Sequence, residues 1–352
     1  MIPNDRYPQA VEVLRRARRI LLTTHVKPDG DALGSLAALR RWLLAQGKAV
    51  EIVVPTPPPA RYAFLDPDGA VRATGPDAEG AADPPDLVAV VDTGTWQQLQ
   101  NVAPLVRRAP LVLVIDHHLT QDDVGTIVLA DTEACATAVL VHRLLTAAGA
   151  RMDAETATYL FAGLACDTDW FRLPTSGPET LRLAAELVEA GAKPSLIYER
   201  LYWDNDLARM HLLGRALETL HSALGGRVMV MRLAQATLRE AGTDAGDTEN
   251  LINECMKVRG VEVGVMLVEA PSTGCCAGGV VRVSLRSRPG TDVLTVAERF
   301  GGGGHRHAAG ACITASLDEA ERQVLSALGG VAGSVPAGPE TPCSGPKRPE
   351  KA

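Results

Sequence analysis

Four separate stretches of the sequence carry side chains that can bind metal ions or transfer protons. The first, THVKPDGDALGS at residues 24–35, places one histidine and two aspartates within seven residues. Shorter stretches follow at residues 90–94 (VVDTG), 115–118 (IDHH) and 166–172 (CDTDWFR). The candidate residues are His25, Asp29, Asp31, Asp92, Asp116, His117, His118 and Asp167.

Each stretch alone has a plain structural explanation. A PDGD sequence commonly forms a turn, an aspartate before Thr-Gly can cap a helix, and an HH pair is often part of a surface loop. Together they are hard to explain by turn chemistry, because burying several carboxylates side by side is costly unless cations compensate their charge. The set therefore predicts a metal centre.

The ligand types narrow the choice of metal. Carboxylate oxygens mixed with imidazole nitrogens, without cysteine, favour manganese and suit magnesium, iron, cobalt or zinc less well. A single ion could not use all of these groups. Two ions that share a bridging carboxylate could do so, at the roughly 3.5–4 Å spacing of sites that cleave phosphoesters.

The elements around these stretches alternate between short apolar runs and amphipathic helical patterns, which is typical of βαβ units. We predict strands at Ile20–Thr24, Val50–Val54, Leu87–Asp92 and Leu111–Asp116. We predict helices at Leu33–Gln46 and near Ala136–Ala148, Asp153–Cys166 and Pro178–Ala190. The predicted fold class is α/β, with a mostly parallel N-terminal sheet that has helices on both faces. Because ligands bind at the carboxyl ends of parallel strands, the stretches that follow these strands would meet at one edge.

The rest of the chain predicts a second, smaller α/β domain. Residues 1–192 form the catalytic domain in this interpretation, and a helical pattern at 193–224 forms a connector. Residues 225–330 contain the strand-like runs VMVMRL, VEVGVMLVE and VVRVSLRS. Residues 331–352 are rich in proline, glycine and charge and are predicted to be disordered.

Composition excludes some classes of protein. The formal net charge of −7 argues against broad binding of long nucleic acid, which depends on neutralising many phosphates. The chain has no apolar stretch of roughly 20 residues and no signal-peptide pattern at its N-terminus, which predicts a soluble, cytoplasmic protein. The seven cysteines contain no C-x-x-C pair and are expected to be reduced.

The four stretches together resemble the motifs of the DHH phosphoesterase superfamily. HVKPDGDALGS resembles the first motif, VVDTG the second, DHH at residues 116–118 the third and CDTDWFR the fourth. The resemblance implies two divalent metal ions, most consistent with manganese. One ion would be held by His25, Asp29 and Asp92, and the other by Asp31, Asp92, His117 and Asp167. The implied catalytic residues are Asp116, which would orient a ligand imidazole, and His118, which would contact the substrate phosphate.

A glycine-rich stretch, ERFGGGGHRHAAGA at residues 298–311, resembles the signature of the DHH-associated domain of RecJ-like nucleases, alanyl-tRNA synthetases and nanoRNases. Glycines let the backbone approach a ligand closely and offer its N–H groups to an anion. VSLRSRPGTDV at residues 283–293 resembles the segment that precedes this loop in nanoRNases. The implied substrate-binding residues are Arg286, Ser287, Gly302, Gly303, Gly304 and His305.

The resemblance implies a two-metal phosphoesterase with its active site in an interdomain cleft. Its expected substrates are very short oligoribonucleotides, including pGpG-like dinucleotides, and 3′-phosphoadenosine 5′-phosphate, which would yield AMP. A cyclic-dinucleotide phosphodiesterase that uses the same site is the main alternative. A manganese inorganic pyrophosphatase and a non-catalytic nucleotide-binding or RNA-binding module are weaker alternatives. Neither a membrane nor long double-stranded nucleic acid is expected as a partner, and a homodimer is an expectation from the family.

Overall fold

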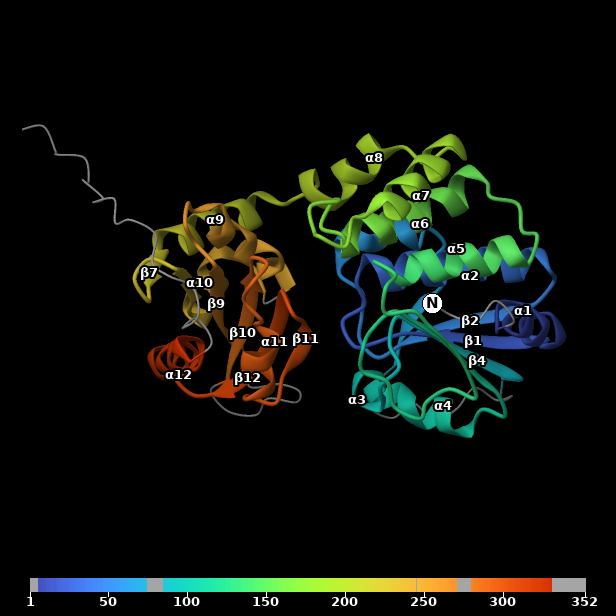
Figure 1. Ribbon diagram of the computed structural model, residues 1–352, viewed down its shortest axis with the longest axis horizontal. Coiled ribbons are helices and arrows are strands. Elements are labelled where there is room, and N and C mark those ends of the chain that lie inside the picture. Colours follow the sequence, from blue (N-terminus) through green and yellow to red (C-terminus); the bar gives the residue numbers. More distant parts are fainter. Residues whose placement is uncertain (1–5, 75–84, 245, 271–279, 331–352) are drawn as a thin grey trace, which may run out of the picture. The chain divides into compact units, whose positions relative to one another are not determined.

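The structure is a computed structural model, and it describes residues 6–74, 85–244, 246–270 and 280–330. The chain divides into two compact units, Met1–Asp204 and Asn205–Ala352 (Figure 1). The tail at 331–352, predicted to be disordered, lies outside the described residues. Among the described residues, no helix is both long and apolar enough to span a bilayer.

The first unit is built on a six-stranded parallel sheet. Its strands are β1 (Arg19–Thr23), β2 (Ala49–Val54), β3 (Val71–Ala73), β4 (Leu87–Val91), β5 (Val112–Asp116) and β6 (Ile127–Ala130). They lie in the order β3-β2-β1-β4-β5-β6, with every neighbouring pair parallel. The predicted α/β fold class is confirmed. The four predicted strands correspond to β1, β2, β4 and β5, whereas the short edge strands β3 and β6 were not predicted.

Helices cover both faces of this sheet. They are α1 (Arg6–Arg16), α2 (Gly30–Ala45), α3 (Trp96–Leu99), α4 (Ala103–Arg108), α5 (Thr137–Ala147), α6 (Ala154–Asp167), α7 (Pro178–Glu189) and α8 (Pro194–Tyr198). The 3₁₀ helices η1 (Ala60–Leu65) and η2 (Gln100–Val102) and the π-helix η3 (Glu199–Trp203) complete the unit. Figure 1 shows α2 and α5 on one face of the sheet and α3 and α4 on the other.

The longer strands contribute to two hydrophobic cores, because successive side chains point to opposite faces. In β1, Ile20 and Leu22 belong to the core under α2, α5 and α6, and Leu21 belongs to the core beside α3 and α4. All five residues of β4 and all five of β5 are buried. Continuous apolar strands of this kind are expected of a parallel sheet that is covered on both faces.

The strand order defines where a ligand should bind. Strands β1 and β4 are neighbours. From β1 the chain adds β2 and β3 on one side, and from β4 it adds β5 and β6 on the other, so the strand order reverses between β1 and β4. In open α/β sheets, ligands bind at this switch point, beyond the carboxyl ends of the strands. His25 lies two residues after β1, and Asp92 directly follows β4. The sheet topology therefore brings the first two sequence stretches together.

Glycines allow α2 and α6 to pack closely, and this contact also positions acidic residues. A Cβ atom at Gly34 would overlap the carbonyl oxygen of Tyr159, and one at Gly163 would lie 2.8 Å from Asp31 Oδ1. Asp31 is in the first turn of α2, and Asp167 is the last residue of α6. The close packing of the two helices therefore holds these acids near one another.

The second unit contains a mixed six-stranded sheet in the order β11-β12-β10-β9-β8-β7. Its strands are β7 (His221–Ala223), β8 (Val228–Leu233), β9 (Val263–Ala270), β10 (Val280–Ser287), β11 (Gly303–His305) and β12 (Ala308–Thr314). The pair β8 and β9 is parallel, and the other four pairs are antiparallel. The three predicted strand-like runs correspond to β8, β9 and β10.

The helices of the second unit pack on its sheet. They are α9 (Leu207–Glu218), α10 (Gln235–Ala241), α11 (Leu294–Glu298) and α12 (Leu317–Gly329), together with the 3₁₀ helices η4 (Gly246–Thr248) and η5 (Leu251–Lys257). The segment 193–224, predicted to be a helical connector, contains α8, η3, α9 and the strand β7. The division between the two compact units falls inside this segment, after Asp204.

Candidate metal centre

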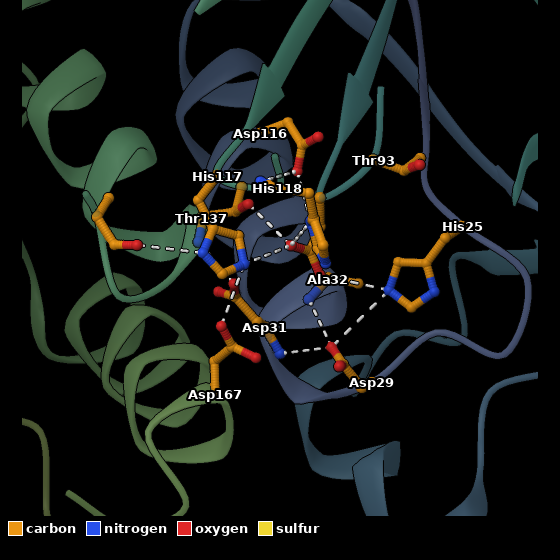
Figure 2. A network of polar contacts seen from close by, with 12 residues as sticks. His25, Asp29, Asp31, Ala32, Thr93, Asp116, His117, His118, Thr137 and Asp167 are labelled. Carbon is orange, nitrogen blue, oxygen red and sulfur yellow. Dashed lines mark hydrogen bonds and ion pairs between the residues drawn. The ribbon is translucent and has the colours of Figure 1, made fainter. Parts of the chain in front are cut away.

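Acidic and histidine side chains of the first unit gather in one cluster (Figure 2), and Asp92 belongs to three of the groups that could hold a metal ion. Its Oδ2 atom is 3.3 Å from His25 Nε2, and its Oδ1 atom is 3.6 Å from His117 Nε2. Its backbone has a φ of 62°, a left-handed conformation that is uncommon outside glycine but more frequent for aspartate. The Asp92 side chain is almost fully buried and presents its two oxygens to different histidines.

The first group of potential ligands consists of His25, Asp29 and Asp92. Their ligand atoms all lie within 4.8 Å of one another. The Nδ1–H of His25 donates to the carbonyl oxygen of Val26 at 2.8 Å, which directs Nε2 toward Asp92. Asp29 is the N-cap of α2, and its Oδ1 accepts hydrogen bonds from the N–H groups of Asp31 and Ala32 at 3.0 and 3.1 Å. The contact of His25 Nδ1 with a backbone carbonyl is typical of metal-binding histidines, in which the nitrogen that does not face the ion fixes the ring.

The second group consists of Asp31, Asp92 and His117, whose ligand atoms also lie within 4.8 Å of one another. Asp167 approaches this group, with its Oδ2 atom 3.1 Å from His117 Nε2. The Nδ1–H of His117 donates to the carbonyl oxygen of Ala134 at 3.2 Å, so Nε2 faces the acids. Asp92 belongs to both groups, which is the arrangement that a bridging carboxylate requires.

A further group, Asp92, Asp116 and His118, adjoins these two. The Oδ1 atom of Asp116 accepts a hydrogen bond from His118 Nδ1 at 2.7 Å and another from the His118 backbone N–H at 3.2 Å. The side-chain amide of Gln121 donates to the other oxygen, Asp116 Oδ2. Asp116 is fully buried, whereas about a third of the His118 side chain is exposed. Asp116 was expected to orient the imidazole of a metal ligand, but the ring that it holds in the structure is that of His118, the residue expected to contact the phosphate. His118 is the more accessible of the two.

The protonation properties of the acids reflect their crowding. Burial, together with the charge of Asp92, raises the pKa of Asp31 and of Asp167 well above the ordinary value. Burial also acts to raise the pKa of Asp92, but the hydrogen bond from His25 and the charges of His118, His25 and His117 hold it below its ordinary value. Without a cation, burial and the charge of Asp92 therefore shift the protonation of Asp31 and Asp167 toward the neutral form.

The histidines respond in the opposite direction. Burial acts to lower the pKa of His25, but its hydrogen bond to Asp92 and the charges of Asp29 and Asp92 outweigh burial and raise the pKa to about 9. Burial likewise opposes protonation of His118, but Asp116 and the charge of Asp92 raise its pKa to about 10. Protonated imidazoles thus supply part of the positive charge that this acidic cluster requires.

The donor set fits divalent metal ions. Buried carboxylates repel one another in a medium of low dielectric constant, and a bound cation removes that penalty. Asp167 is the last residue of α6, where the negative end of the helix dipole disfavours an anion unless a cation lies nearby. Oxygen and imidazole ligands around a shared aspartate suit manganese or a similar ion. These groups could therefore hold a metal ion in each of the first two groups.

The predicted substrate-binding residues lie in the second unit, around β10 and the β11–β12 hairpin. Arg286 and Ser287 end β10, and Gly303, Gly304 and His305 form the exposed strand β11. The Ser287 hydroxyl donates to the carbonyl oxygen of Thr291 at 2.6 Å and lies 3.0 Å from His307 Nδ1. Ser287 therefore has a role in shaping this turn, whatever else it binds.

The glycines of this loop differ in what requires them. A Cβ atom at Gly302 would overlap the carbonyl oxygen of Gly310, and one at Gly304 would lie 2.5 Å from the carbonyl oxygen of Ala308. Gly303, in contrast, has open space where a Cβ atom would be. Close packing of the hairpin backbone thus explains Gly302 and Gly304, whereas the backbone at Gly303 has open space in which to meet a ligand.

Two polar residues beside the acids were not predicted. Thr137, the first residue of α5, contacts both Asp31 and Asp92. Gln121 contacts Asp116 and donates to the carbonyl oxygen of His118 at 3.2 Å. The only local signal for Thr137 was its position before an apolar helical pattern, which also fits an ordinary helix start.

Comparison with known proteins places these features in context. The family model described as the DHH family, N-terminal domain, matches residues 19–164, and the DHHA1 domain model matches residues 214–332. A Thermus thermophilus protein named bifunctional oligoribonuclease and PAP phosphatase NrnA is 32% identical, covering 93% of this chain and 95% of that protein. The Bacillus subtilis protein of the same name is 29% identical, covering 86% and 91% respectively. The crystal structure of an exopolyphosphatase-related protein from Bacteroides fragilis superposes with a TM-score of 0.85 at 24% identity, covering 93% of this chain and 96% of that one.

Proposed function

Since the chain belongs to the DHH family, we propose that it is a two-metal phosphoesterase that hydrolyses very short oligoribonucleotides to mononucleotides. We also propose that it converts 3′-phosphoadenosine 5′-phosphate to AMP. The observation that carries the proposal is the shared carboxylate of Asp92, whose two oxygens face two groups of potential ligands. The names of the two similar proteins, which match nearly the full length of this chain, support the choice of substrates.

We assign the metal ligands from this geometry. His25, Asp29 and Asp92 would hold one ion, and Asp31, Asp92, His117 and Asp167 would hold the other. Manganese is the ion that this mixture of oxygen and nitrogen donors favours. When bound, the two ions would lower the pKa of a coordinated water and neutralise negative charge on the phosphoryl oxygens.

The chain's own side chains would orient the substrate phosphate. His118 is partly exposed, and because Asp116 holds its Nδ1–H, its Nε2 would be the ring nitrogen that contacts the phosphate. In the metal-free chain, the hydrogen bond with Asp116 and the charge of Asp92 outweigh burial and raise the pKa of His118 to about 10, and a protonated ring would donate a hydrogen bond to a phosphoryl oxygen. Asp116 would keep the ring in this orientation, since Gln121 in turn fixes the Asp116 carboxylate.

The second unit would bind the rest of the substrate. Arg286 offers a guanidinium group for a phosphate, and Gly303 and His305 lie in an exposed strand with donors that suit an anion. We propose that Arg286, Ser287, Gly302, Gly303, Gly304 and His305 surround a terminal phosphate or nucleotide. A cytoplasmic location and a homodimer stay predictions from the sequence.

The test is a comparison of substrates with the full chain. The purified protein would be stripped with EDTA, reloaded with manganese and assayed on RNAs ranging from dinucleotides to strands of several tens of residues. Parallel assays would use 3′-phosphoadenosine 5′-phosphate, pyrophosphate and cyclic di-AMP, with Asp92→Asn as the control. We expect fastest release of mononucleotides from the shortest RNAs and no turnover by the control. Equal rates on long RNAs, or turnover of pyrophosphate alone, would overturn the substrate assignment.

A further inference from the structure

Thr137 contacts two of the three aspartates proposed as ligands of the second ion, although it is not a ligand itself. It is the first residue of α5 and is fully buried. Its hydroxyl donates to Asp92 Oδ1 at 2.8 Å, and its backbone N–H donates to Asp31 Oδ2 at 2.6 Å (Figure 2). One residue thus connects the shared carboxylate with a carboxylate of the second ligand group.

The hydroxyl of Thr137 is one of the hydrogen-bond partners that set how the Asp92 carboxylate is turned, and His25 is another. The terminal torsion of an aspartate side chain has a broad energy profile, so the plane of its carboxylate is set by its hydrogen-bond partners. The hydroxyl has one proton to donate, and it donates it to Oδ1, the oxygen on the side of His117. Oδ2 is thereby left 3.3 Å from His25 Nε2. Each oxygen keeps a lone pair for an ion, since a carboxylate has about four acceptor sites.

The start of α5 fixes Asp31 at the same time. Ala136, the N-cap residue of α5, provides no side-chain cap, and the N–H groups of Thr137 and Ala138 instead donate to the two oxygens of Asp31 at 2.6 and 2.9 Å. Asp31 lies 106 residues earlier in the chain than Thr137. The N-terminus of a helix attracts negative charge, which favours the ionised carboxylate that a metal ligand must be.

We propose that Thr137 is a positioning residue that orients Asp92 as the bridge and aligns Asp31 with it, so that both ions bind as a pair. This inference rests on the two-metal centre of the proposed function, and it concerns how the chain holds that centre. If Thr137 only filled space in the core, its substitution would change the stability of the folded chain equally with and without metal. If Thr137 is a positioning residue, its substitution specifically weakens binding of the ion pair.

The experiment compares substitutions of Thr137 with a matched threonine elsewhere in the first unit. Thr137→Val removes the hydroxyl and keeps the branched shape and the backbone N–H, whereas Thr137→Ser keeps the hydroxyl. Thr156→Val is the control, because Thr156 is also a buried first-turn threonine whose hydroxyl bonds an aspartate, Asp153. Thr156 lies at the opposite end of α6 from Asp167.

Binding of manganese to each full-length variant is measured by equilibrium dialysis and by electron paramagnetic resonance. A pair of neighbouring manganese ions gives a spin-coupled signal that isolated ions do not give. We expect two ions per chain and the coupled signal for the wild type, Thr137→Ser and Thr156→Val. We expect Thr137→Val to bind the second ion about 10–100-fold more weakly and to lose the coupled signal, in line with other substitutions of groups that orient metal ligands.

Several results would overturn the inference. One is a Thr137→Val variant with wild-type manganese affinity and an intact coupled signal. Another is a loss of manganese affinity in Thr137→Ser, or in Thr156→Val, that equals the loss in Thr137→Val. A wild type that binds no ion pair would overturn both this inference and the proposed function, whereas a paired wild type beside an unaffected Thr137→Val removes only the inference. Thr137→Ala, which also lacks the hydroxyl, is the substitute if circular dichroism finds Thr137→Val unfolded.

Discussion

Asp29 caps a helix and is also proposed to bind a metal ion, and different substitutions can separate these two roles. Its Oδ1 atom caps α2 by accepting the N–H groups of Asp31 and Ala32, and the same carboxylate belongs to the first ligand group with His25 and Asp92. Asn keeps an acceptor for the cap but loses the negative charge, and Ala loses both. We therefore expect Asp29→Asn to fail only in metal binding, and Asp29→Ala to fail in metal binding and in helix capping.

The magnitudes follow from these contacts. In EDTA, loss of the cap should make Asp29→Ala about 1 kcal/mol less stable than Asp29→Asn. The charge of Asp29 helps to raise the pKa of Asp31 and Asp167, so its removal relieves repulsion and offsets the lost attraction to the helix dipole. Asp29→Asn should therefore lie within about 1 kcal/mol of the wild type in EDTA.

Manganese should stabilise the wild type more than Asp29→Asn, so that their stabilities no longer match. An ion present at 100 times its dissociation constant stabilises the folded state by about 2.7 kcal/mol. If the loss of one carboxylate ligand weakens binding about 100-fold, the same concentration would contribute only about 0.4 kcal/mol. For a unit of this size, that difference corresponds to a fall of roughly 5–9 °C in the manganese-induced rise of the melting temperature.

The assay can be confined to the first unit. The four tryptophans of the chain are Trp42, Trp96, Trp170 and Trp203, and all of them precede residue 205. Thermal unfolding followed by tryptophan fluorescence therefore reports on this unit, in EDTA and in manganese. An equal manganese-induced rise in Asp29→Asn and the wild type would refute the role of Asp29 as a ligand. Equal stability of the Asn and Ala variants in EDTA would refute the cap.

Four further predictions concern the packing, the histidines and the active site. Gly163→Ala should place a Cβ atom 2.8 Å from Asp31 Oδ1 and 3.0 Å from Ala138 Cβ, and therefore destabilise the first unit by about 1–3 kcal/mol in urea unfolding while it weakens manganese binding. Because the raised pKa of His25, about 9, means that an ion must displace its proton, manganese affinity measured by calorimetry should rise with pH between 6 and 9 by up to about tenfold per unit for one proton; a flat profile would contradict this. In the metal-free protein, the raised pKa values of His25 and His118 mean that protonation of these rings stabilises the folded state. This contribution is fully present below pH 6.5 and is lost as the pH rises through 9 to 10. Measurements of unfolding in EDTA across that range would test it. Asp116→Asn should lower kcat by about 10–100-fold with little change in KM, since it releases the His118 ring without removing a proposed ligand; an unchanged kcat in steady-state assays would contradict the role of Asp116.

The sequence predicted the parts of the fold that have a strong periodic signal. β1, β2, β4 and β5 are apolar runs of five or six residues, and the helix that contains Asp31 has regularly spaced leucines. β3 is three residues long and partly exposed, and β6 is four residues long with alternating burial. Such short edge strands carry too few residues for a period to be recognised, and pairing with a neighbouring strand defines them instead.

The strand order could not be read from the sequence either, although it determines which acids meet. The order is set by the direction in which each connection crosses the sheet, and that depends on packing rather than on any local pattern. The prediction needed only the weaker statement that the carboxyl ends of parallel strands share an edge. The structure adds that β1 and β4 are neighbours at the switch point, so His25 and Asp92 are side by side.

Residue type identifies metal ligands in a sequence better than it identifies the groups that orient those ligands. Few side chains bind a divalent ion, so aspartates and histidines that follow apolar strands stand out in a sequence. Any hydrogen-bond donor can orient a ligand, including the hydroxyl of Thr137, the amide of Gln121 and the backbone N–H of Ala138. Thr137 is separated by 45 residues from Asp92, and nothing in its type or neighbours distinguishes it from an ordinary first residue of a helix. The role proposed for Thr137 is a property of the contact, because folding places its hydroxyl 2.8 Å from Asp92, the carboxylate proposed to bridge two ions.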